Sequence, residues 1–98
     1  MKIYFTIAGA HYFHGTEFME RGMKVYLEKE HDNKFDTEAI KVSMEGLGQV
    51  GHVANSVNTV IGESYSAGRI YDKIGEIASG EIMYVLPNAA VCVLETEV

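Results

Sequence analysis

Two groups of acidic and imidazole side chains have a spacing that could support metal binding or hydrolysis. His11 and His14 lie three residues apart with Glu17 beyond them, and Asp32 and Asp36 lie four apart. A metal site needs three or four converging ligands, which two histidines at the end of a strand do not supply. Closely spaced acids in a loop more often shape a turn. We therefore predict a protein that is not an enzyme and has no metal and no cofactor, and a hydrolase built on these side chains is kept only as a third hypothesis.

A glycine pattern and a single cysteine are the remaining candidates for chemistry. Residues 46–51 read GLGQVG, which matches the dinucleotide pattern G-x-G-x-x-G, but that motif needs a helix directly after it to point amides at a pyrophosphate. Here Gly51 falls inside a predicted strand, so we interpret 46–48 as a hairpin turn. Cys92 is the one cysteine. It can form no internal disulfide, so it offers no evidence that the protein is secreted. Its place in the last predicted strand indicates a small core residue.

Strands must position these side chains, because apolar residues recur with a period of two. The alternation predicts half-buried strands at 3–8, 23–28, 39–44, 49–53, 81–86 and 90–97. Tight turns are predicted at 46–48 and at Pro87-Asn88. Six short, mostly antiparallel strands close most easily into a small barrel, which hides their edges.

Helix signals are few. Val57, Val60 and Ile61 follow Val53 at helical spacing, which predicts a short helix over 55–61. A second helix over 66–73 is ambiguous, because Gly68 weakens it. The predicted fold class is therefore mainly β, a six-stranded barrel with one or two short helices.

Length and charge limit the function classes. The 98 residues, 47% of them hydrophobic, fit a single domain over 1–98 with its own core. The net charge of −6 argues against broad, salt-driven coating of nucleic acid, which needs a basic face. No run approaches the ~18 apolar residues of a membrane span, and the short apolar N-terminal run is interpreted as the first strand of a cytoplasmic protein.

Two distant stretches resemble a known family when they are taken together. Residues 7–15 (IAGAHYFHG) end in an aromatic run, and Asn33-x-Phe35-Asp36-x-x-Ala-Ile-x-Val is followed by the stretch 49–53 (QVGHV). This order and spacing resemble the core signature of HIRAN domains, which occur fused to SWI/SNF-type remodelling helicases and as free-standing bacterial proteins. Residues 66–72 (SAGRIYD) are similar to the small bacterial members.

The resemblance implies an OB-like barrel that binds the 3′ end of single-stranded DNA. The positions that it assigns to nucleic-acid binding are His11, Tyr12, Phe13, Asn33, Phe35, Asp36, His52 and Asn55. Aromatic faces stack on bases with little regard to sequence, and Tyr12 and Phe35 are our candidates for that role. Asn33 and His52 could donate to phosphate or to base edges. A carboxylate repels a phosphate but accepts from a hydroxyl, so Asp36 would favour a terminal 3′-hydroxyl.

Structural explanations compete with these roles. Asp36 could simply bind neighbouring amides, and Phe35 could be a core residue. Arg69, with Tyr71 and Lys73, is either an extra basic and aromatic patch or a solvated helix face.

The chain also departs from the DNA-binding pattern of the family. His11, mostly neutral at pH 7, holds its basic position, and Asn55 stands where a lysine is common. The partners that we expect are a single-stranded DNA end, a helicase or nuclease, and a second copy of the chain paired through an exposed edge. The main alternative is a protein-interaction module on the same barrel with little or no nucleic-acid binding.

Overall fold

Six strands account for most of the secondary structure. The computed structural model describes residues 1–96. The strands are β1 (Lys2–Ala8), β2 (Lys24–Lys29), β3 (Ile40–Met44), β4 (Gly48–Val53), β5 (Ile77–Leu86) and β6 (Ala89–Glu95). One turn of α-helix, α1 (Ala67–Ile70), runs into the 3-10 turn η2 (Tyr71–Lys73), and another 3-10 turn, η1 (Ala10–Tyr12), follows β1.

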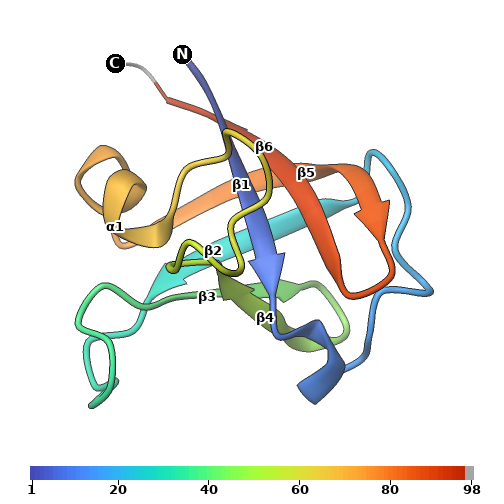
Figure 1. Cartoon of the computed structure of the whole chain (residues 1–98), viewed down its shortest axis with the longest axis horizontal. Coiled ribbons are helices and arrows are strands. Elements are labelled where there is room, and N and C mark those ends of the chain that lie inside the picture. Colours follow the sequence, from blue (N-terminus) through green and yellow to red (C-terminus); the bar gives the residue numbers. More distant parts are fainter. Residues whose placement is uncertain (97–98) are drawn as a thin grey trace.

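The strands close into a barrel in the order β1-β4-β3-β2-β5-β6, with each neighbouring pair antiparallel (Figure 1). The two predicted tight turns lie where β3 meets β4 and where β5 meets β6, with Leu86 opposite Ala89 across Pro87-Asn88. The prediction of a mainly β protein, a small six-stranded barrel with one or two short helices, is confirmed.

The barrel interior holds the apolar set that the alternation predicts. Its largest fully buried side chains include Phe5, Ile3, Ile7, Leu27, Ile40, Ile82, Val25, Val42 and Val50. Cys92 is fully buried on β6 among them. Because a thiolate is poorly solvated there, burial raises the pKa of the Cys92 thiol to about 12.

Gly51 allows β1 to join β4 and complete the barrel. A Cβ atom at this position would lie 2.7 Å from the carbonyl oxygen of Ala8 and 2.7 Å from Cγ2 of Ile7. The Ala8 oxygen belongs to the backbone, so no change of a neighbouring side-chain rotamer could make room for a side chain at position 51. The pairing that results, Ile7 with Val53 and Ala8 with His52, brings the end of β1 beside the end of β4.

The helix predicted over 55–61 is wrong. The segment forms turns, with the N–H groups of Thr59 and Val60 donating to the carbonyl oxygen of Ser56, and then crosses β1 (Figure 1). The N–H of Ile61 donates to Oγ1 of Thr6 at 3.2 Å, and the hydroxyls of Thr6 and Ser64 lie 2.7 Å apart. These bonds to β1 replace helical ones.

The ambiguous helix over 66–73 is confirmed as α1 and η2, capped where the N–H of Arg69 donates to Oγ of Ser66 at 3.3 Å. The fifth strand begins at Ile77, earlier than the predicted residue 81, because 77–80 pair with β2. Within residues 1–96, no helix has both the length and the apolar character required to cross a bilayer.

Candidate nucleic-acid interface

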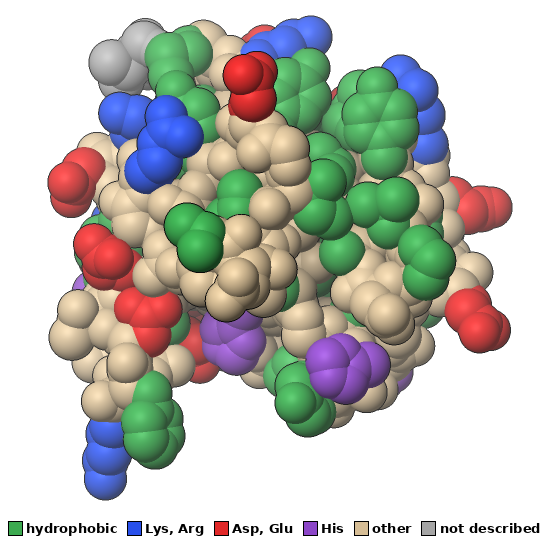
Figure 2. Space-filling model, in the orientation of Figure 1, with side chains coloured by type: hydrophobic (Ala, Val, Ile, Leu, Met, Phe, Trp, Pro, Cys, Tyr) green, Lys and Arg blue, Asp and Glu red, His purple; other side chains and the backbone are tan. Residues whose placement is uncertain are grey.

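Three segments that are far apart in the sequence meet at one open hollow between the ends of β1 and β4. The hollow has a volume of about 470 Å³, within the range of roughly 300–1,000 Å³ that is common for ligand sites. We call it the aromatic hollow, and its lining residues are Ala8, Gly9, Tyr12, Phe13, Asp36, His52, Val53, Ala54, Asn55, Ser56 and Thr59. Figure 2 shows histidine and hydrophobic side chains at the lower edge of the molecule, where Figure 1 places β4 and η1.

The two aromatic side chains of the first segment are presented by a sharp turn at the end of β1. Gly9 has φ +71°, a left-handed conformation that favours glycine, and η1 follows directly. Tyr12 is 79% exposed and Phe13 is 41% exposed. The Phe13 ring centroid lies 6.5 Å from that of His52, tilted by 56°. The rings of Tyr12 and Phe13 therefore keep exposed faces that a planar ligand could cover.

The second segment, residues 33–38, is shaped by its own side chains. Oδ1 of Asn33 accepts the N–H groups of Phe35 and Asp36 at 2.9 and 3.0 Å, and Oδ1 of Asp36 accepts the N–H of Glu38 at 2.9 Å. Such side-chain turns explain why Asn and Asp occur at these positions. They aim the Asp36 carboxylate into the aromatic hollow.

Phe35 and His11 lie outside the lining of the aromatic hollow. Phe35 is 99% exposed, so the alternative that it belongs to the core is wrong. Asn33 likewise does not line the hollow. His11 lines an adjoining hollow that shares Ala8 and Gly9 with the first one, and its ring centroid lies 4.0 Å from that of Tyr12.

The imidazole of His52 has an acidic partner that the sequence did not reveal. Its Nε2 lies 2.5 Å from Oε1 of Glu30, which directly follows β2. The two positions are brought together across β3 by two antiparallel pairings and a bulge between Val42 and Ser43. A carboxylate beside His52 competes with any phosphate for the same donor.

Asn55 ties the aromatic hollow to α1. Its Nδ2 donates to Oδ2 of Asp36 at 3.0 Å, and its Oδ1 accepts the N–H of Gly68 at 2.8 Å. The amide therefore fixes the Asp36 carboxylate from a second side. A single Asn side chain does this because it offers a donor and an acceptor at once.

The charge around the aromatic hollow is sparse. Its lining contains one carboxylate, one imidazole and neither lysine nor arginine. Binding there would depend on ring surfaces and hydrogen bonds more than on cations. This agrees with the net charge of −6.

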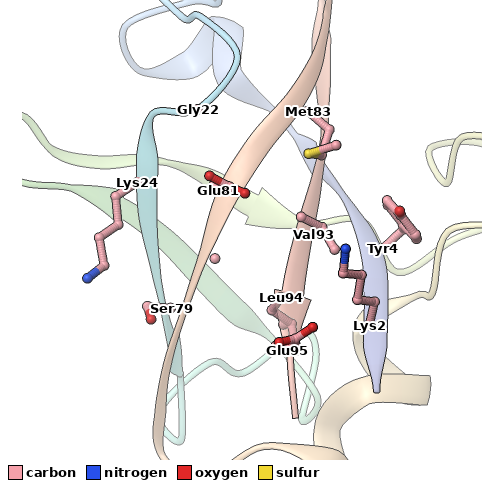
Figure 3. Close-up of a pocket in the computed structure, with 11 residues that line it drawn as sticks. Lys2, Tyr4, Gly22, Lys24, Ser79, Glu81, Met83, Val93, Leu94 and Glu95 are labelled. Atoms are coloured by element: carbon pink, nitrogen blue, oxygen red, sulfur yellow. The ribbon is translucent and has the colours of Figure 1, made fainter.

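A larger groove lies on the outer face of β1, β2, β5 and β6, and it contains none of the predicted site residues (Figure 3). Tyr4, Met83 and Val93 line it together with two lysines, Lys2 and Lys24, and two acids, Glu81 and Glu95. Its opposite charges give it no preference for a polyanion, so we place the candidate nucleic-acid site at the aromatic hollow.

The histidines and acids singled out for metal binding do not converge. Nε2 of His14 lies 3.1 Å from the carbonyl oxygen of Leu47. In the part of the chain that the structure describes, residues 1–96, no three His, Cys, Asp or Glu side chains form a group that could hold a metal ion.

The structure thus brings together five of the eight sequence-predicted residues in one lining, namely Tyr12, Phe13, Asp36, His52 and Asn55. His11 and Phe35 directly precede Tyr12 and Asp36 in the chain, and Asn33 accepts the N–H of Asp36. Sequence reasoning missed Glu30, Ser56 and Thr59. A polar residue at any of these positions carries no signal of its own, because only the pairing of strands places it at the site.

Comparison with known proteins identifies the family. The family model of the HIRAN domain matches residues 1–86. The crystal structure of the HIRAN domain of human HLTF is similar, with a TM-score of 0.69 and 19% sequence identity over 95% of this chain and 72% of that chain, a likeness that establishes the fold. No curated protein sequence matches the chain. The family is known for DNA binding, so membership in it supports a nucleic-acid-binding module. Because the family match covers more than half of the sequence, the chain belongs to the HIRAN domain family.

Proposed function

We propose that this chain binds the 3′-hydroxyl end of single-stranded DNA in the aromatic hollow, without catalysis. It acts alone or beside a helicase or nuclease in the cytoplasm. Tyr12 stacks on a base in the hollow, Phe13 closes its side, and Asp36 accepts the terminal hydroxyl. Phe35, which lies outside the lining, stacks on a base beyond it. The observation that carries the proposal is the convergence of exposed rings with a fixed carboxylate from three separate segments.

The exposure of the rings supports stacking. A phenyl ring that is 99% exposed, as Phe35 is, gains from any partner that covers it, because burial of apolar surface is favourable by about 25 cal/mol per Å². Tyr12 offers a second large surface, 79% exposed. Base stacking on such rings contributes about 1–3 kcal/mol per base.

The Asp36 carboxylate has acceptor capacity left for a ligand. A carboxylate offers about four acceptor positions. The N–H of Glu38 uses one of them and Nδ2 of Asn55 uses another. A sugar hydroxyl could donate to a remaining position, whereas a 3′-phosphate would bring like charges together.

Fluorescence anisotropy with a short labelled strand tests the proposal. We expect a strand with a 3′-hydroxyl to bind at least tenfold more tightly than the same strand with a 3′-phosphate, since one lost charge-assisted bond and one new repulsion together exceed about 1.4 kcal/mol. Asp36→Asn should abolish this preference, and Asp32→Asn, which removes the same charge at an exposed position outside the hollow, should keep it. Equal affinity of the wild type for both ends would refute the role of Asp36.

A second candidate function is a protein-interaction module, and the outer-face groove favours it (Figure 3). Apolar side chains among opposite charges are typical of a polar-rimmed surface that binds protein. On this alternative, no labelled single strand binds at physiological salt whatever its 3′ end.

A further inference from the structure

We propose that Arg69 binds a backbone phosphate of the DNA strand on the 5′ side of its terminal nucleotide. This inference rests on the proposed function of the aromatic hollow and extends the path of the strand beyond it. The site lies where the turns after β4 meet the start of α1.

A second hollow continues from the first. We call it the Arg69 hollow, and its lining residues are Asn55, Ser56, Val57, Val60, Ser64, Ser66 and Arg69. Asn55 and Ser56 line both hollows, so the two share a border and not merely a side of the molecule. A strand that leaves the first hollow over this border enters the second.

The aromatic hollow has no cation of its own, and Arg69 supplies one beside it. Each nucleotide carries a phosphate, yet no lysine or arginine lines the aromatic hollow. Asn55 is neutral, and the imidazole of His52 is held by Glu30. Arg69 supplies the guanidinium of the adjoining hollow, and arginine is suited to phosphate because its planar donors match two oxygens.

The guanidinium of Arg69 is already held in place. Its Cζ lies 3.9 Å from the ring centroid of Tyr65, a cation–π contact. The Tyr65 backbone is fixed in turn, since its N–H donates to the carbonyl oxygen of Tyr4 at 2.7 Å. One face of the guanidinium is thus occupied by the ring, and its N–H edges remain available. A side chain positioned in this way loses little freedom when it binds a ligand.

The direction of the strand follows from the proposed role of Asp36. If the terminal 3′-hydroxyl meets Asp36 in the aromatic hollow, the rest of the strand leaves through its 5′ phosphates. The border at Asn55 and Ser56 lies on that route, because Asn55 contacts both Asp36 and the backbone of Gly68. Arg69 follows Gly68 directly, so it is placed to meet one of the first of these phosphates.

Arg69→Ala, Arg69→Lys and the control Arg21→Ala test the inference. Arg21 is also an arginine above a tyrosine, with its Cζ 5.9 Å from the Tyr84 ring centroid. Its segment lies across the barrel from α1 (Figure 1). The affinity of each protein for a short 3′-hydroxyl strand is measured by anisotropy over a series of salt concentrations, and thermal unfolding verifies that each variant is folded.

We expect Arg69→Ala to weaken binding about tenfold, as loss of a charge-assisted contact implies. It should also lower the slope of log affinity against log salt by about 0.7, the value for one single-strand phosphate. Arg69→Lys should restore the slope, and Arg21→Ala should match the wild type. An unchanged affinity and slope in Arg69→Ala would overturn the assignment of Arg69 while end binding stands. A wild type that binds no single strand would overturn both proposals.

Discussion

Nδ2 of Asn55 donates a 3.0 Å hydrogen bond to Oδ2 of Asp36, nineteen residues earlier in the chain. The same side chain accepts the N–H of Gly68 at 2.8 Å. Asn55 is therefore a neutral residue at the site that fastens the loop 33–38 to α1. Placing a cation at this position should have opposite consequences for affinity and stability.

Asn55→Lys is expected to strengthen binding of single-stranded DNA and to weaken the fold. An added cation beside the aromatic hollow should steepen the salt slope by about 0.7. Loss of the bond to Gly68 should lower the free energy of unfolding by about 1 kcal/mol. Anisotropy and urea unfolding measure the two effects. Asn55→Ala is the control and should lose stability without gaining affinity; a gain in both variants would contradict the electrostatic explanation.

Glu30→Gln is expected to increase affinity several-fold at low salt, because it removes a negative charge that lies 2.5 Å from His52 and frees that imidazole for phosphate. Glu28→Gln is a matched control on β2, the strand that Glu30 directly follows. Glu28 pairs with Lys41 at 3.3 Å and does not line the aromatic hollow. If the two variants gain affinity equally, the effect is one of net charge and Glu30 has no special relation to the site.

Phe35→Ala is expected to weaken binding by about fivefold to a hundredfold, which corresponds to the ~1–3 kcal/mol of one base stack. The unfolding midpoint should not change, because the ring is 99% exposed and has no packing to lose. Tyr84→Ala removes another exposed ring, 58% exposed on β5, and should leave binding intact. Equal losses in both variants would indicate non-specific adhesion to aromatic surface.

The strands could be predicted because alternation reports burial directly. Ile3, Phe5 and Ile7 all point into the barrel, as their spacing implies. The segment 55–61 has apolar residues at helical spacing, but they are not buried together as one helical face, since Val57 is 95% exposed. Its conformation is decided by bonds to Thr6, whose partners lie more than fifty residues away. Local periodicity carries no information about such long-range contacts.

The site could be predicted only in part for the same reason. Tyr12, Asp36 and His52 could be found through a resemblance that preserves their order in the chain, and they do line one hollow. Glu30 reaches His52 through the register of β2, β3 and β4, which shifts at the bulge between Val42 and Ser43. A shift of one residue changes which side chains are neighbours across the sheet, and nothing in the sequence marks it.

The buried thiol of Cys92 makes stability depend on pH in the alkaline range. Burial raises its pKa from 9.0 to about 12. Between these two pH values, the unfolded chain has released the thiol proton and the folded chain retains it. The unfolded state then binds fewer protons, and the free energy of unfolding falls as pH rises. The contribution is complete below pH 9 and is lost as the pH approaches 12.

Cys92→Ala isolates this contribution from the tyrosines and lysines that ionise in the same range. Urea unfolding of both proteins at pH 8 and pH 10.5 should show a larger loss of stability for the wild type than for the variant. A thiol reagent at pH 8 should leave the folded wild type unmodified and react once urea unfolds it, because the thiolate is the reactive form. Rapid modification of the folded protein would mean that the barrel opens at β6. If the wild type and Cys92→Ala lose equal stability between pH 8 and pH 10.5, the thiol has the same pKa in the folded and unfolded states and the expected contribution is absent.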